Sequence, residues 1–72
     1  MNEYTITFTW DDEASVWIAE SRDLPGLILE SGSLDALMER VKFAVPDLLE
    51  LNRVDNTQLK LHLKADRLAV VA

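Results

Sequence analysis

The sequence predicts a small α+β domain with the element order β-β-β-α-β, in which one helix covers one face of an antiparallel-rich sheet. Three observations carry this prediction. Residues 3–10 and 58–65 alternate between apolar and polar side chains, as strands with one buried face do. Residues 34–52 instead repeat their apolar side chains at helical spacing. A length of 72 residues is enough for a single domain, residues 1–72, with a small core.

The first strand is predicted over residues 3–10 because its large apolar side chains fall on one face and its threonines on the other. The polar tip that follows lacks glycine, which predicts a loop longer than a two-residue turn. The apolar face consists of Tyr4, Ile6, Phe8 and Trp10, and the tip of Asp11, Asp12 and Glu13.

The returning strand is predicted over residues 15–21, and it carries apolar side chains on both faces. Glu20 shares a face with Val16 and Ile18, so that face is assigned to the outside of the sheet. Trp17 and Ala19 are therefore assigned to the core. Val16 and Ile18 are then expected on the outer face, near the threonines of the first strand.

A stiff turn is predicted at Asp23-Leu24-Pro25-Gly26. Pro25 fixes its own φ and moves Leu24 away from helical geometry, whereas Gly26 tolerates a positive φ. We interpret Asp23, Pro25 and Gly26 as structural turn residues. The third strand is expected over residues 27–30, with Gly32 ending it.

The helix is predicted to begin after Ser33, which is a good N-cap, and Asp35 suits the first helical turn. Pro46 lies inside the apolar stripe and removes one backbone hydrogen bond. Because the stripe keeps its phase across Pro46, one kinked helix ending near Asn52 is preferred; a break at Val45 is the alternative. The stripe consists of Leu34, Leu37, Met38, Val41, Val45 and Leu48, flanked by Ala44 and Leu49.

The remaining chain is predicted as a polar loop over residues 53–57 and a fourth strand over residues 58–65. A turn at Asp66-Arg67 and a short apolar tail, residues 68–71, are expected after it. His62 alternates with lysines on the outer face of this strand, so a solvated surface histidine is expected there.

Composition excludes several classes of function. The chain has no cysteine and a single histidine, which leaves no cysteine-based zinc site or disulfide framework, and no cofactor or metal site is predicted. Its apolar runs are too short to span a bilayer, and the N-terminus does not resemble a signal peptide. A cytoplasmic location is therefore expected.

The formal net charge of -6 is concentrated in the first half of the chain. Residues 1–35 hold eight acidic groups against one basic group, whereas residues 36–72 hold five acidic and six basic groups. An acidic surface repels phosphate, so direct nucleic-acid binding is not expected. It attracts a basic protein partner and accelerates the encounter, although net charge also serves solubility alone.

The acidic tip, Asp11-Asp12-Glu13, could be read as a metal or nuclease cluster. Hard cations require several converging oxygens, and three consecutive carboxylates on a hairpin tip point in different directions. A solvated turn is the better interpretation, and no catalytic residue is predicted.

Candidate contact residues for a partner or a second copy lie in three places: the acidic tip, the outer sheet face and the outer side of the helix. They are Asp11, Asp12 and Glu13 at the tip, Val16 and Ile18 on the sheet, and Phe43 on the helix. The simpler interpretation is that a half-open sheet and a small helix tolerate a few exposed apolar residues. A small core supplies only ~3–5 kcal/mol, so a homodimer is expected.

The sequence pattern W-D-D-E-A…V-W-I-A-E-S…D-L-P-G-L over Trp10–Leu27 resembles sequences of the HicB-like antitoxin family. The helix segment from Leu34 to Asn52 extends the resemblance to about two-thirds of the chain. The match is to short members that consist of the N-terminal domain alone, and it implies a partial ribonuclease-H-like fold.

The resemblance implies a non-enzymatic antitoxin-like protein that binds a small basic HicA-like toxin, an RNA-cleaving protein, and blocks its active site. Full-length family members add a C-terminal DNA-binding domain. Only about seven residues follow the last predicted strand, so no such domain is expected. Two alternatives stay open: a self-associating module, and a degenerate ribonuclease-H-like enzyme that uses the acidic tip.

Overall fold

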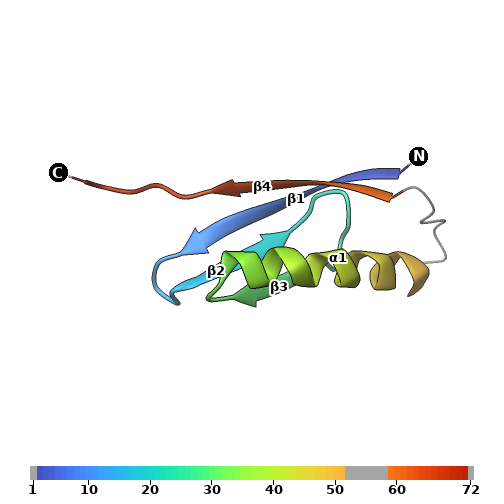
Figure 1. Cartoon of the computed structure of the whole chain (residues 1–72), viewed down its shortest axis with the longest axis horizontal. Helices are drawn as coiled ribbons and strands as arrows, with labels where there is room; N and C mark the ends of the chain where they lie inside the picture. The colour runs from blue at the N-terminus through green and yellow to red at the C-terminus, as the bar shows by residue number, and fades with distance from the viewer. Residues whose placement is uncertain (1, 52–58, 72) are drawn as a thin grey trace.

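A computed structural model describes residues 2–51 and 59–71, which fold into a four-stranded sheet with one helix on one face (Figure 1). The predicted α+β class and the order β-β-β-α-β are confirmed. The elements are β1 (Asn2–Asp11), β2 (Val16–Glu20), β3 (Ile28–Ser31), α1 (Leu34–Leu51) and β4 (Leu59–Asp66).

The sheet is mixed, with the strand order β3-β2-β1-β4. Antiparallel pairs join β1 to β2 and β2 to β3, whereas β4 lies parallel to β1. The helix α1 packs against β3 and β2. The core that α1 forms with the sheet also includes Ile6 and Phe8 of β1, whereas β4 lies at the edge of the sheet.

The core lies between α1 and the inner face of the sheet, as the alternation in β1 predicts. Phe8 is fully buried, and its neighbours across the sheet are Ala19 on β2 and Ala65 on β4. One large ring thus fills the space between two small residues. Trp10 and Trp17 pair across the hairpin in an edge-to-face arrangement, with ring centroids 5.6 Å apart.

The hairpin loop spans residues 12–15, which confirms a loop longer than two residues. Ser15 closes it with a φ of 55°, a left-handed conformation that is uncommon for a residue other than glycine. This single residue turns the chain so that Val16 begins β2 opposite Asp11 of β1.

The predicted stiff turn is a β-turn closed by a 3.1 Å hydrogen bond from the Leu27 amide to the Leu24 carbonyl. Gly26 has a φ of 95°, which confirms the predicted positive value and suits the third residue of a type II turn. Leu24 and Leu27, on either side of the turn, are both buried in the core. The turn therefore places two core side chains.

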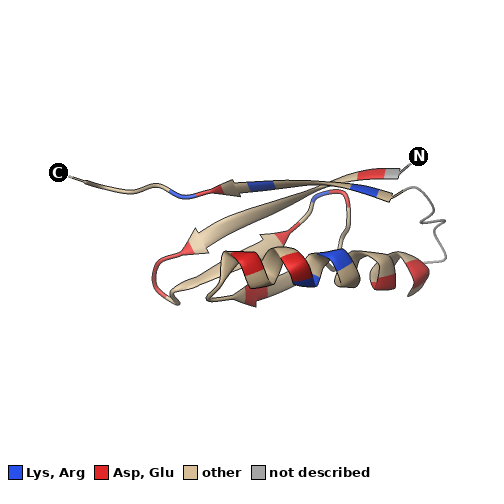
Figure 2. Cartoon of the chain, in the orientation of Figure 1, with Lys and Arg blue, Asp and Glu red and all other residues tan. Residues whose placement is uncertain are grey.

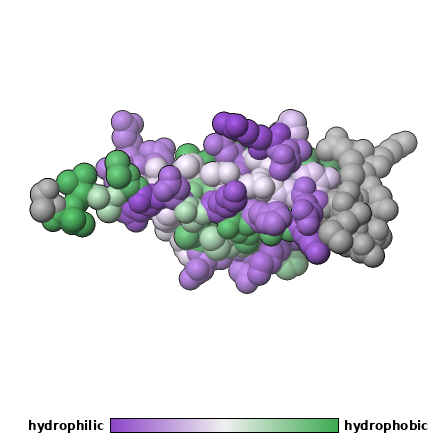
Figure 3. Space-filling view, turned by 90° about the horizontal axis from the view of Figure 1, so that it is seen from above, coloured by the Kyte–Doolittle hydropathy of each residue, from purple (hydrophilic) through white to green (hydrophobic). Residues whose placement is uncertain are grey.

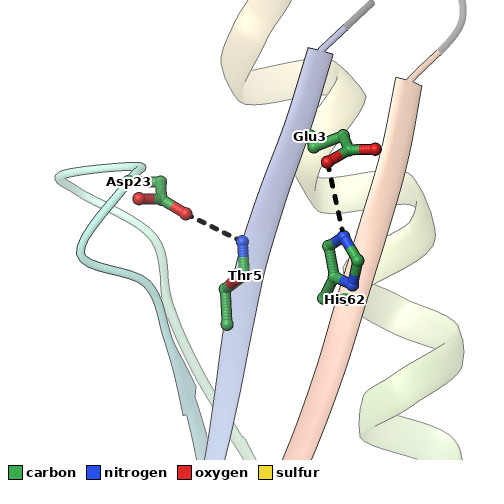
Figure 4. Close-up of polar contacts among 4 residues, drawn as sticks. All are labelled: Glu3, Thr5, Asp23 and His62. Atoms are coloured by element: carbon green, nitrogen blue, oxygen red, sulfur yellow. Dashed lines mark hydrogen bonds and ion pairs between the residues drawn. The ribbon is translucent and has the colours of Figure 1, made fainter.

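Two polar side chains before this turn attach it to β1. An oxygen of Asp23 accepts a 2.8 Å hydrogen bond from the Thr5 amide (Figure 4), and the Ser21 hydroxyl donates a 2.6 Å bond to the Thr5 carbonyl. Pairing of β1 with β2 begins only at Thr7, opposite Glu20. Ser21 and Asp23 thus satisfy the backbone groups of Thr5 where β2 no longer pairs with β1.

Gly26→Ala should lower the free energy of unfolding by about 1–3 kcal/mol, because a side chain at positive φ strains the backbone. A Cβ at position 26 would meet no atom within 4 Å, so the loss would come from the backbone alone. Gly32→Ala is the matched control, since its Cβ would lie 3.9 Å from the Ser15 carbonyl oxygen, an ordinary contact. Urea denaturation of both variants is the measurement, and equal losses would contradict a strained turn at Gly26.

The helix begins as predicted, because the Ser33 hydroxyl accepts a 3.2 Å hydrogen bond from the Ala36 amide. It continues through Pro46 to Leu51, so the single helix is confirmed and the break at Val45 is not observed. Its expected end near Asn52 falls outside the described residues. The side chains that α1 buries against the sheet are Leu37, Val41, Val45 and Leu49.

The predicted turn at Asp66-Arg67 is wrong. Asp66 belongs to β4, where it pairs with Thr9, and the chain then runs on in the same direction as an irregular extended tail (Figure 1). Just beyond β4, the Arg67 guanidinium stacks over the Trp10 ring at 4.0 Å from its centroid. The predicted loop over residues 53–57 lies outside the described part of the chain.

Candidate functional site

The acidic hairpin tip is organised by its own hydrogen bonds. One oxygen of Asp11 accepts bonds from the amides of Glu13 and Ala14, at 3.1 and 3.3 Å. Asp12 accepts a 3.1 Å bond from the indole N–H of Trp10. Asp11 and Asp12 therefore shape the loop as well as charge it, a role that the sequence pattern alone did not indicate.

The tip carboxylates do not converge on one point. Within residues 2–51 and 59–71, no group of three or more His, Asp and Glu side chains is close enough to hold a metal ion. Asp11 is turned back onto the loop backbone, and Asp12 is turned toward Trp10. The arrangement suits an exposed negative surface better than a metal-dependent active site.

Val16 and Ile18 lie on the outer face of β2, where the sequence placed them, and both are half-buried. In the sheet, Val16 is opposite Asp11, and Ile18 lies between Thr9 of β1 and Glu30 of β3. The acidic tip and the apolar pair therefore belong to one continuous surface, on the side of the sheet away from α1.

Ile28 is a further member of this surface that the sequence analysis did not single out. It lies opposite Glu20 on the outer side of β3 and is 68% exposed. The sequence feature that could have identified Ile28 is the alternation of β3, in which Leu29 faces the core and Ile28 and Glu30 face outward. We call the whole set the hairpin surface: Asp11, Asp12, Glu13, Val16, Ile18, Glu20, Ile28 and Glu30.

Phe43 lies apart from the hairpin surface. It is 73% exposed on α1, whose opposite side buries Val41 and Val45 against the inner face of the sheet. The sheet therefore separates Phe43 from Val16 and Ile18. The contact residues predicted from the sequence form two separate surfaces rather than one.

Charged residues are divided between the strands (Figure 2). The β1–β2 hairpin and β3 carry acidic residues, whereas β4 carries Lys60 and Lys64, which the register with β1 places on the outer face. Between these two lysines, His62 lies with its Nε2 atom 3.6 Å from a carboxylate oxygen of Glu3, and both side chains are about half exposed (Figure 4). His62 is thus exposed, as its position in the alternation predicted, and the structure adds Glu3 as an acidic neighbour.

A shallow groove of about 550 Å³ lies between these two halves of the outer face. The charged residues in its lining are two cations, Arg22 and Lys64, and one acid, Glu20. Mixed charge of this kind gives no preference for an anionic or a cationic ligand. The remaining lining residues are Thr5, Thr7 and Ser21.

Comparison with known proteins places the chain in a family. A domain of unknown function, DUF1902, matches residues 3–72. The chain belongs to the DUF1902 family. This DUF1902 chain is similar to a protein of solved structure, the hypothetical protein TTHA1013 from the extremely thermophilic bacterium Thermus thermophilus. The two sequences are 39% identical. The structural alignment has a TM-score of 0.82 and covers 97% of this chain and 100% of the other.

No curated protein matches this DUF1902 chain. The comparisons therefore provide a family and a fold, and they name no activity. In the described ranges, no helix is long and apolar enough to cross a membrane.

Proposed function

We propose that this DUF1902 protein is a non-enzymatic, antitoxin-like protein-binding domain that neutralises a small basic RNA-cleaving toxin of the HicA-like kind. The proposal joins the resemblance of Trp10–Leu27 to HicB-like antitoxins with the geometry of the hairpin surface. The observation that carries it is the outer face of the β1–β2 hairpin, where Val16 and Ile18 lie among acidic side chains.

The hairpin surface combines the two features that a docking site for a basic protein requires. Its carboxylates attract a positive partner over distances of several ångströms and accelerate the encounter. Its apolar side chains, with Ile28 the most exposed, supply area that is buried only when the partner is in place. A toxin that binds RNA is basic, and it therefore has the complementary charge.

The same charges disfavour binding of nucleic acid by this surface, because phosphate would be repelled. The orientation of the tip carboxylates disfavours the enzyme alternative, because Asp11 and Asp12 direct their oxygens to the loop amides and to Trp10. The self-associating module remains compatible with the proposal, because a dimer can present two hairpin surfaces.

The purified protein should therefore cleave neither RNA nor DNA, with or without Mg²⁺ or Mn²⁺. The physical reason is that metal-assisted hydrolysis requires carboxylates converging on one ion, which the described tip residues do not provide. Fluorescent single- and double-stranded substrates give the measurement. Asp12→Asn serves as the control, and cleavage that this variant abolishes would contradict the proposal and favour the enzyme alternative.

The direct test is to isolate the protein from its native cell with its bound partner. We expect a small basic protein that cleaves RNA once separated and is inhibited when the purified chain is added back at equal molar amount. Ile18→Asp, which places a charge at the centre of the hairpin surface, should abolish inhibition, whereas Phe43→Asp on the other side of the molecule should not. An acidic partner, or inhibition that survives Ile18→Asp, would contradict the proposed surface.

A further inference from the structure

β4 is a long, open edge of the sheet. Among the described residues it pairs with β1 along one side only, over the whole of Leu59–Asp66. The opposite edge, β3, is only four residues long, and its Glu30 carbonyl accepts a 3.0 Å hydrogen bond from the Arg40 guanidinium. An eight-residue edge presents a row of backbone donors and acceptors that can pair with another strand.

The tail that continues β4 is apolar and exposed. Leu68, Val70 and Val71 are 92%, 87% and 93% exposed, and they form the hydrophobic projection at one end of the molecule (Figure 3). Pairing with β1 stops at Asp66, so the tail runs on beyond the strand that supports β4. Residues 59–71 thus form one extended segment, and within the described part of the chain nothing covers the apolar side chains of its second half.

We propose that a second copy of this chain occupies this edge. The two copies pair antiparallel along residues 59–71, around a two-fold axis that is perpendicular to the sheet and passes beside Ala65. The two four-stranded sheets then form one continuous sheet, with both helices on the same face, because this axis keeps inner side chains opposite inner side chains.

The charges of Lys64 and Asp66 favour this register over its two neighbours. With the axis at Ala65, Lys64 of each copy lies directly opposite Asp66 of the other, which gives two opposite-charge pairs. An axis one residue earlier would place Lys64 opposite Lys64, and an axis one residue later would place Asp66 opposite Asp66. Directly opposed like charges destabilise a strand pair, so both neighbouring registers are disfavoured.

The same register gives the exposed apolar residues a partner. Ala69 and Val71 of one copy lie opposite Leu61 and Leu59 of the other, two inner-face leucines that α1 leaves half-exposed. On the outer face, Leu68 and Val70 lie opposite His62 and Lys60, whose carbon atoms provide apolar contact. The hairpin surfaces remain free at the two ends, so this dimer does not depend on the proposed function.

Ala65→Cys tests the axis directly, because the natural chain contains no cysteine. Directly opposed residues of an antiparallel pair have Cα atoms about 4.5–5.5 Å apart, within the disulfide range of about 4.4–6.8 Å. We expect mild oxidation to convert this variant to a covalent dimer of twice 8.2 kDa. Ala36→Cys, exposed on α1, is the matched control and should form no disulfide-linked dimer under the same conditions, as judged on a non-reducing denaturing gel.

A charge exchange tests the register. Lys64→Asp or Asp66→Lys alone should weaken the dimer by about tenfold or more, since each converts two attractive pairs into repulsive ones. The double exchange should restore wild-type affinity in sedimentation experiments. A wild-type monomer at high micromolar concentration, or a dimer that ignores both the exchanges and Ala65→Cys, would overturn the proposal. A dimer that is disrupted only by Ile18→Asp would place the interface on the hairpin surface. That result would also overturn the proposed pairing along β4.

Discussion

Phe8→Ala should leave most of the protein unfolded at room temperature. Truncating a buried phenylalanine costs about 3–5 kcal/mol, which equals the ~3–5 kcal/mol that a core of this size supplies. The site favours the upper part of that range, because the neighbours of Phe8 across the sheet are Ala19 and Ala65. Three alanines in a row would leave a cavity that neither directly opposite side chain is large enough to fill.

Phe43→Ala is the matched control, because the same side chain is removed from a position that is 73% exposed. We expect its free energy of unfolding to stay within about 0.5 kcal/mol of the wild type. Urea denaturation followed by tryptophan fluorescence gives both values, since Trp10 and Trp17 lie on the same sheet face as Phe8. Phe8→Leu, with an expected loss of about 1–2 kcal/mol, provides a measurable value if Phe8→Ala does not fold. Similar losses for Phe8→Ala and Phe43→Ala would contradict this description of the core.

The periodic parts of the fold could be predicted because each is determined by local residue spacing. The alternation in residues 3–10 placed Phe8 in the core, and the acidic Glu20 assigned Val16 and Ile18 to the outer face. The helix could be followed through Pro46 because the apolar stripe kept its phase on both sides. A proline removes one hydrogen bond, whereas the burial of Val45 and Leu49 acts on both sides of it.

Pairing between distant segments could not be read from the sequence. Nothing local indicates that β4 joins the sheet beside β1, parallel to it, rather than beside β3. The bonds from Ser21 and Asp23 to Thr5 depend on where β2 stops pairing with β1, which is a property of the assembled sheet. The predicted turn at Asp66 failed for the same reason, because its place in β4 is fixed by pairing with Thr9.

Some residues of the candidate site could likewise be predicted from local spacing, whereas others required the assembled fold. Val16 and Ile18 could be named because their strand has two apolar faces and only one of them can face the core. Ile28 was missed, since β3 is too short for its alternation to be distinctive. That Phe43 lies on the other side of the sheet from Ile18 required the position of α1. Only this placement shows that Phe43 and the hairpin surface lie apart, and it allows the charge of the hairpin surface to be tested alone.

Removing the three charges of the hairpin tip should slow association with a basic partner by about tenfold or more at low salt, because steering by complementary charge accelerates encounter by about 10–10³-fold. The variant is Asp11→Asn, Asp12→Asn and Glu13→Gln. Amide oxygens can still accept the bonds from the Glu13 and Ala14 amides and from the Trp10 indole, so the loop should keep its shape. The off-rate should change little, because exposed charges at the rim of an interface act mainly on encounter.

The matched control removes three exposed charges from the helix instead: Glu39→Gln, Asp47→Asn and Glu50→Gln. Both variants have the same net charge, so a difference between their on-rates reports where the charge lies. Surface plasmon resonance over a series of salt concentrations gives the measurement, and the difference should vanish at high salt, where screening limits exposed charges to about 3 Å. Equal on-rates for the two variants would show that net charge alone governs the encounter. The hairpin surface would then lose its proposed role in attracting the partner, and the contribution of Val16, Ile18 and Ile28 would have to be sought in the off-rate alone.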